Sequence, residues 1–146
     1  MRYNTTKRDP IKNSFIMPNE IFRLGLSEGA IAVYAYLLYC EDRGTYQCYP
    51  SYTTIACAIG KSKNSIRKYV AELVSKRLIE TEHTTVILKD GRKHNGSLKY
   101  TILPIDKAVR HHEEVQMCQL KIEQAKREAE KRLAEYDRKH PKTASV

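Results

Sequence analysis

Apolar residues in the first half of the chain recur every three to four positions, which is typical of amphipathic helices. The three stripes are Ile31, Tyr34, Ala35 and Leu38, then Ile55, Ala56 and Ile59, and then Ile66, Tyr69, Val70 and Leu73. They predict three helices, over residues 26–39, 52–59 and 62–76. A serine that can cap the amino terminus stands at the start of each helix, namely Ser27, Ser51 and Ser62.

The second and third helices are separated by only a few residues. Gly60 lies at the junction, and glycine readily adopts the positive φ that lets a helix end in a sharp turn. The sequence therefore predicts a helix-turn-helix centred on this glycine.

Beyond the third helix the pattern changes from helical to extended. Residues 81–88 are rich in threonine and β-branched side chains, which favours a strand. Two turn dipeptides, Asp90-Gly91 and Asn95-Gly96, follow, and then Leu98, Tyr100 and Ile102 alternate with polar neighbours. We predict a β-hairpin with a basic tip. Upstream, residues 15–22 suggest a short strand and one helical turn packed over the same core.

Residues 106–139 contain no glycine or proline and are dense in strong helix formers, which predicts one long helix. Heptad spacing runs through Ala108, His111, Val115, Cys118, Ile122, Ala125, Ala129, Arg132 and Tyr136. This seam suggests a homodimer formed through the helix. A solvated single helix, or a helix folded back on the domain, fits the same pattern.

Polar and cationic residues gather at the start of the third helix, away from its apolar stripe. Backbone amides, Lys and Arg satisfy DNA phosphates, while Asn, Ser and Arg can bond base edges in the major groove. We therefore expect contacts with double-stranded DNA from Lys61, Ser62, Lys63, Asn64, Ser65, Arg67 and Lys68. The alternative is the solvated face of an ordinary amphipathic helix.

The hairpin adds a second group of candidate contacts, at residues 89–97. Its basic side chains can reach the phosphate backbone or the minor groove beside the helix; they are Lys89, Arg92, Lys93 and His94. A solvated loop whose charges only maintain solubility is the alternative.

Charge is uneven along the 146 residues. The net charge is +9, and residues 1–105 hold 16 Lys or Arg against 9 Asp or Glu. The positive field therefore lies on the helix-turn-helix part, as a polyanionic partner requires. Residues 1–14 are polar and basic, and we expect a flexible arm. With no apolar run of about 18 residues and no visible secretory signal, we expect a cytoplasmic protein that does not enter a membrane.

The sequence offers little that suggests catalysis or a cofactor. The four cysteines match no common zinc-binding spacing, and we expect Cys40 and Cys57 to be small core residues in a reducing compartment. Phosphate-binding glycine loops, nucleophile elbows and His-Glu metal motifs are not found. We expect no enzyme activity, no cofactor and no metal site.

Four segments together resemble a known kind of domain: PNEIF, LSEGAIAVYAYL, YPSYTTIACAIGKSKNSIRKYVAELVSKRLI and the hairpin end SLKYTI. They are similar to the winged helix-turn-helix domains of replication initiators, replisome organisers and regulators encoded by plasmids, phages and conjugative elements of Gram-positive bacteria. The resemblance covers about residues 15–103. Such families often have Thr where this chain has Ser65, which keeps the hydroxyl.

The resemblance implies an α+β, mostly α fold: a winged helix-turn-helix with a basic β-hairpin wing, followed by a long carboxy-terminal helix. The expected organisation is an arm at 1–14, the winged domain at 15–104, and the long charged helix with a disordered tail at 105–146. The recognition helix would be residues 62–76.

Two functions fit these observations. The first is a sequence-specific double-stranded DNA-binding protein of a mobile element, acting as a transcriptional regulator or at a replication origin. The second is a winged-helix protein-interaction module that docks replication or transcription machinery without reading DNA. Charge favours the first, because an interaction module has no need for so many cations on one side.

Overall fold

A computed structural model describes residues 13–141 of the chain. The chain divides into two compact units, Met1–Val109 and Arg110–Val146. The predicted arm falls almost entirely outside the described residues, and the predicted tail beyond Pro141 falls entirely outside them.

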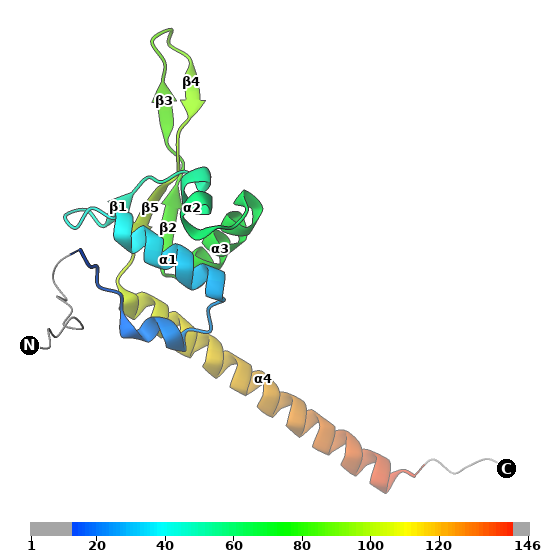
Figure 1. Cartoon of the computed structure of the whole chain (residues 1–146). Coiled ribbons are helices and arrows are strands. Elements are labelled where there is room, and N and C mark those ends of the chain that lie inside the picture. Colours follow the sequence, from blue (N-terminus) through cyan, green and yellow to red (C-terminus); the bar gives the residue numbers. More distant parts are fainter. Residues whose placement is uncertain (1–12, 142–146) are drawn as a thin grey trace, which may run out of the picture. The chain divides into compact units, whose positions relative to one another are not determined.

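The first unit contains a short 3-10 helix, three α-helices and small strands (Figure 1). The helices are η1 (Asn19–Arg23), α1 (Glu28–Cys40), α2 (Tyr52–Ile59) and α3 (Lys63–Ser75). The strands are β1 (Gln47–Cys48), β2 (Ile79–Glu82), β3 (Thr85–Ile87), β4 (Lys93–Asn95) and β5 (Lys99–Ile102). All three predicted α-helices are present. Residues 15–18, which precede η1, do not form the expected strand.

The three predicted serine caps form. Each serine hydroxyl accepts a hydrogen bond from the backbone N–H three residues later: Ala30 to Ser27, Thr54 to Ser51 and Ser65 to Ser62. Gly60 ends α2 at φ 78°, and its N–H donates to the Ala56 carbonyl. The helix-turn-helix junction therefore has the left-handed turn that its glycine predicts.

Strand β1, which lies between α1 and α2, joins β2 and β5 in a three-stranded antiparallel sheet of order β1-β5-β2. The sequence did not indicate β1, which is only two residues long and pairs Cys48 with Tyr100. Beyond this sheet, β3 and β4 form a separate two-stranded ribbon that extends from it (Figure 1).

The predicted single strand over 81–88 is therefore wrong in detail, because the chain leaves one ladder after Glu82 and enters another at Thr85. Of the two turn dipeptides, only Asp90-Gly91 makes the turn, with Gly91 at φ 84°. Asn95 instead pairs with Thr85 within the ribbon.

The core lies between the helices and the three-stranded sheet. On α1 the fully buried residues are Ala30, Val33, Tyr34 and Leu37. Each lies one position before a residue of the predicted face, and Tyr34 is the one predicted residue that is fully buried. The α3 stripe is confirmed by Ile66, Val70 and Leu73. The cysteine prediction is wrong for Cys57, which is exposed, whereas Cys48 is buried. Cys48 points inward because strand β1 places it there.

After the sheet, α4 (Ile105–Lys139) runs as one helix of 35 residues, as predicted. Its first turn contributes Ala108 to the core of the first unit. The fold is thus α+β and mostly α: a winged helix-turn-helix with a β-hairpin wing, followed by a long carboxy-terminal helix.

Candidate nucleic-acid interface

The amino-terminal half of α3 has a buried side and a cationic side. Ile66, Val70 and Leu73 are buried against the core, which fixes the rotation of the helix. The exposed residues around them are Lys61, Ser62, Lys63, Asn64, Arg67 and Lys68. Because the buried stripe and the 3.6-residue period set this rotation, these side chains point to solvent.

Two of the candidate hydroxyls are already occupied locally. The Ser62 and Ser65 hydroxyl oxygens lie 3.0 Å apart, and Ser65 N–H donates to Ser62 Oγ over 3.2 Å. Ser65 is also half-buried. The two serines therefore shape the first turn of α3, and Ser65 is the least accessible of the predicted contacts.

The cations of this surface have no carboxylate neighbours close enough for an ion pair. Among the described residues, Lys61, Lys63, Arg67 and Lys68 form no salt bridge, and the three that occur there involve other cations. The positive helix amino terminus adds to their charge. The result is an uncompensated positive surface on a rigid helix.

The β3–β4 ribbon carries the four hairpin candidates, all of them exposed. Lys89 lies in the turn, and Arg92 Nε is 3.1 Å from Asp90 Oδ2, so its charge is partly neutralised. Lys93 and His94 are adjacent on β4, opposite Ile87 and Val86. Successive strand residues point to opposite faces, so Lys93 and His94 cannot contact the same surface together.

Two features near this surface were not singled out from the sequence. Lys99 is held by Glu82, with Nζ 2.6 Å from Oε2, and this hydrogen bond raises the pKa of Lys99 and lowers that of Glu82. It stabilises the base of the hairpin and is not a free cation. Thr53 is exposed in the first turn of α2, where its hydroxyl can serve a phosphate.

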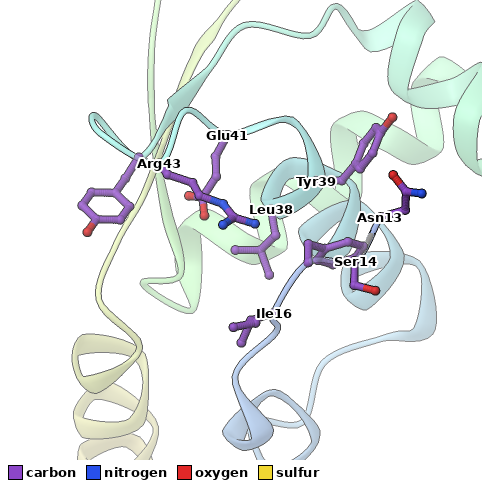
Figure 2. Close-up of a pocket in the computed structure, with 9 residues that line it drawn as sticks. Asn13, Ser14, Ile16, Leu38, Tyr39, Glu41 and Arg43 are labelled. Carbon is purple, nitrogen blue, oxygen red and sulfur yellow. The ribbon is translucent and has the colours of Figure 1, made fainter. Parts of the chain in front are cut away.

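A separate pocket of 630 Å³ lies beside the carboxyl end of α1. Figure 2 shows Arg43 beside Glu41, with Leu38 and Ile16 toward the other side. Glu41 Oε2 is buried without a hydrogen-bond partner among the described residues, and burial raises the Glu41 pKa while Arg43 opposes this shift. The described residues contain no group of three or more His, Cys, Asp or Glu that could hold a metal ion.

The fold, together with this surface, is typical of the class of winged helix-turn-helix proteins. Residues 24–79, from the end of η1 to the start of β2, match the family model of a helix-turn-helix domain. No curated protein matches the chain. In residues 13–141, no helix has both the length and the apolar character needed to cross a bilayer.

Three solved structures are similar to the chain. A "possible transcriptional regulator" of Methanosarcina mazei is 15% identical, with a TM-score of 0.49, over 80% of this chain and 97% of that one. A MarR family transcription regulator is 16% identical, with a TM-score of 0.41, over 84% and 79%. MepR of S. aureus, in complex with DNA, is 14% identical, with a TM-score of 0.36, over 80% and 86%.

Proposed function

We propose that this protein is a sequence-specific double-stranded DNA-binding regulator that reads the major groove with α3. The observation that carries the proposal is the pair of opposite faces on α3. The side with Ile66, Val70 and Leu73 anchors the helix in the core, and the other side presents cations that form no ion pair among the described residues.

On that helix and in the turn before it we assign two kinds of contact. Lys61, Lys63 and Lys68 bind phosphates, because a lysine ammonium acts as a point charge without base selectivity. Arg67 and Asn64 read base edges, since an arginine can bond guanine and an asparagine can bond adenine through two hydrogen bonds each.

The ribbon contributes phosphate or minor-groove contacts through Lys89 and Lys93, with Arg92 weakened by Asp90 and His94 on the opposite face of β4 from Lys93. The wider role, as a transcription regulator or origin-binding protein of a mobile element, follows from the sequence resemblance alone.

The proposal includes a homodimer through α4, because two recognition helices on a repeated half-site bind more tightly than one.

The test is the affinity of the full chain for duplex DNA, measured across a salt series. The ligand is first selected from a random duplex library. Each phosphate-bound cation contributes about 0.9 to the slope of log affinity against log salt. An absence of binding even at low salt would contradict the proposal and favour the protein-interaction alternative.

Arg67→Ala should weaken binding by about tenfold or more and relax preference at one base position.

Lys93→Ala should weaken binding to all sequences alike and lower the salt slope by about one. The matched control is Arg23→Ala. Arg23 is an exposed cation in the last turn of η1, at the end of the first unit away from β3 and β4 (Figure 1). If all three substitutions have equal effects, the assigned surface is wrong.

A further inference from the structure

Within the second unit, residues 110–139 of α4 carry apolar side chains that stay largely exposed, although the Tyr136 ring stacks on one face against His140 at 4.4 Å. Ile122, Leu133 and Tyr136 leave 52%, 63% and 60% of their surface exposed. A lone helix in water gains little stability from propensity, and most helical stability comes from packing an apolar face. This segment therefore needs a partner for its face.

Four of the six large exposed apolar residues in this segment, Val115, Ile122, Leu133 and Tyr136, lie on one stripe along the helix axis, whereas Met117 and Leu120 lie outside it. At about 100° per residue, a single arc of about 80° contains His111, Val115, Cys118, Ile122, Ala125, Ala129, Leu133 and Tyr136. The heptad seam drawn from the sequence placed Arg132 on this line, but a 3.6-residue helix places Leu133 there instead. The steps of four, three and four match a nearly straight helix, not a tightly supercoiled one.

We infer that α4 pairs antiparallel with α4 of a second copy of this chain, such that Cys118 of one copy lies opposite Ala129 of the other. The first reason is side-chain size. In this register Ile122 faces Ala125 of the second copy, and Val115 faces Leu133. The two central layers therefore each pair a large side chain with a small one, and they separate the two Cys118–Ala129 layers, in which both side chains are small.

The second reason is charge. In an antiparallel pair, each edge of the stripe meets the same edge of the other helix. In the same register Glu114 faces Arg132 of the second copy, and Lys121 faces Glu128. Two-fold symmetry makes each contact twice, so four opposite-charge pairs border this edge of the interface.

At the other edge, His112 faces Asp137 of the second copy and Lys126 lies near Glu123. Like charges approach at the ends, where Arg110 and Lys139 of the second copy come near each other, and at the two-fold axis, where the Glu123 residues of the two copies lie at nearly the same level. Lys139 is already 3.5 Å from Glu135 of its own helix, which limits the repulsion at the ends.

A parallel pair fits the same residues less well. Identical residues then face each other, which stacks two successive layers of small side chains at Ala125 and Ala129. Edge contacts five residues apart would also bring Lys121 against Lys126 of the other chain. The antiparallel arrangement avoids both problems.

Cys118 is a built-in reporter for this register, because antiparallel helices keep the two Cys118 residues about eleven positions apart along the axis. The test uses the full chain with Cys57→Ser, which removes another exposed cysteine. In this background, adding Ala129→Cys should give an interchain disulfide on mild oxidation. The same background without Ala129→Cys, in which Cys118 is still present, should give none. The matched controls are Lys131→Cys, on the far side of α4, and Ala129→Cys combined with Cys118→Ser; neither should link.

Charge reversal gives a second readout that does not depend on cysteine. Lys121→Glu should raise the dimer dissociation constant by about tenfold, and adding Glu128→Lys should restore it. In a parallel pair Lys121→Glu would instead tighten the dimer by removing the clash with Lys126. Sedimentation equilibrium of the full chain measures both.

The inference rests on the homodimer of the proposed function and not on its DNA contacts. A disulfide through Cys118 alone, or tighter association of Lys121→Glu, would overturn the orientation while leaving the dimer in place. A monomer at all concentrations would overturn both. In either case, the salt-dependent DNA binding of α3 is tested separately.

Discussion

A single carboxylate connects the start of α1 to α3. Ser27 Oγ donates to Glu72 Oε2 over 2.6 Å, and Ser27 N–H lies 3.4 Å from Glu72 Oε1. The same Ser27 oxygen accepts from Ala30 N–H. One serine thus caps α1 and connects it to the recognition helix, so that Glu72 helps to fix the position of α3.

Glu72→Ala should lower the free energy of unfolding by about 1–2 kcal/mol, because it removes a hydrogen bond to a charged group. Glu72→Gln keeps an acceptor and should cost less. Urea denaturation of the full chain measures both. The control is Glu80→Ala, on the exposed side of β2, which should change the free energy of unfolding little. An equal loss of this free energy at both positions would contradict a specific role of Glu72.

Glu41, beside the pocket in Figure 2, should make stability depend on pH. Burial raises its pKa in the folded chain, so the folded state binds more protons than the unfolded state. The free energy of unfolding therefore falls as pH rises from the unfolded pKa of about 4.3 through the folded value.

Glu41→Gln should raise the melting temperature at neutral pH, because an uncharged amide costs less to bury without a partner than a carboxylate. The gain should disappear below pH about 4, where the wild-type carboxyl is protonated. Thermal unfolding between these pH values measures the difference. Glu80→Gln is the control, and a gain of the same size at both pH values would exclude ionisation of Glu41 as the cause.

At the scale of elements, the ribbon and the sheet have different roles. Tyr100 and Ile102 of β5 are buried, whereas every residue of β3 and β4 is exposed. The ladder of β2 and β5 ends at the Glu82–Lys99 pair, and at the base of the ribbon the Thr84 carbonyl accepts from Gly96 N–H over 2.7 Å. The core is complete without the ribbon beyond this point.

Replacing residues 86–94 by Asn-Gly, a two-residue turn suited to hairpins, should leave the free energy of unfolding within about 0.5 kcal/mol. DNA affinity should fall, and the salt slope should decrease by up to about three, because Lys89, Arg92 and Lys93 are removed. Denaturation and DNA titration of the same variant test the two halves. Unchanged DNA affinity would show that the ribbon is only a solvated hairpin.

At the scale of the whole molecule, folding and association belong to different units. Among residues 13–141, the buried core residues all lie between Ile21 and Ala108, within the unit Met1–Val109. The unit Arg110–Val146 contributes none among its described residues. The core should therefore not require the distal part of α4.

A chain truncated after Gln116 should remain folded, with its near-ultraviolet circular dichroism retained, but should be monomeric by light scattering. It should bind one half-site and lose the gain in affinity from a repeated site. The full chain is the reference on the same two DNAs. A truncated chain that still dimerises would place the contact outside residues 117–146.

The sequence determined what depends on short-range pattern and local chemistry. Three helices, their serine caps, the turn at Gly60 and the long final helix all follow from neighbours within four residues. Ile66, Val70 and Leu73 were identifiable because one stripe on one helix defines a buried face. The exposed cations of α3 follow from that same stripe.

Tertiary structure decided the features that depend on residues far apart in the chain. Strand β1 exists because β5 pairs with it, and that pairing buries Cys48. Cys57, which the helical pattern of the sequence had predicted to lie in the core, is exposed. The α1 face was displaced because Tyr100 and the α3 residues, not α1 itself, define where its core side lies. Asp90 beside Arg92 and Glu82 beside Lys99 determine which cations are free, since cross-strand pairing and turn geometry set those distances.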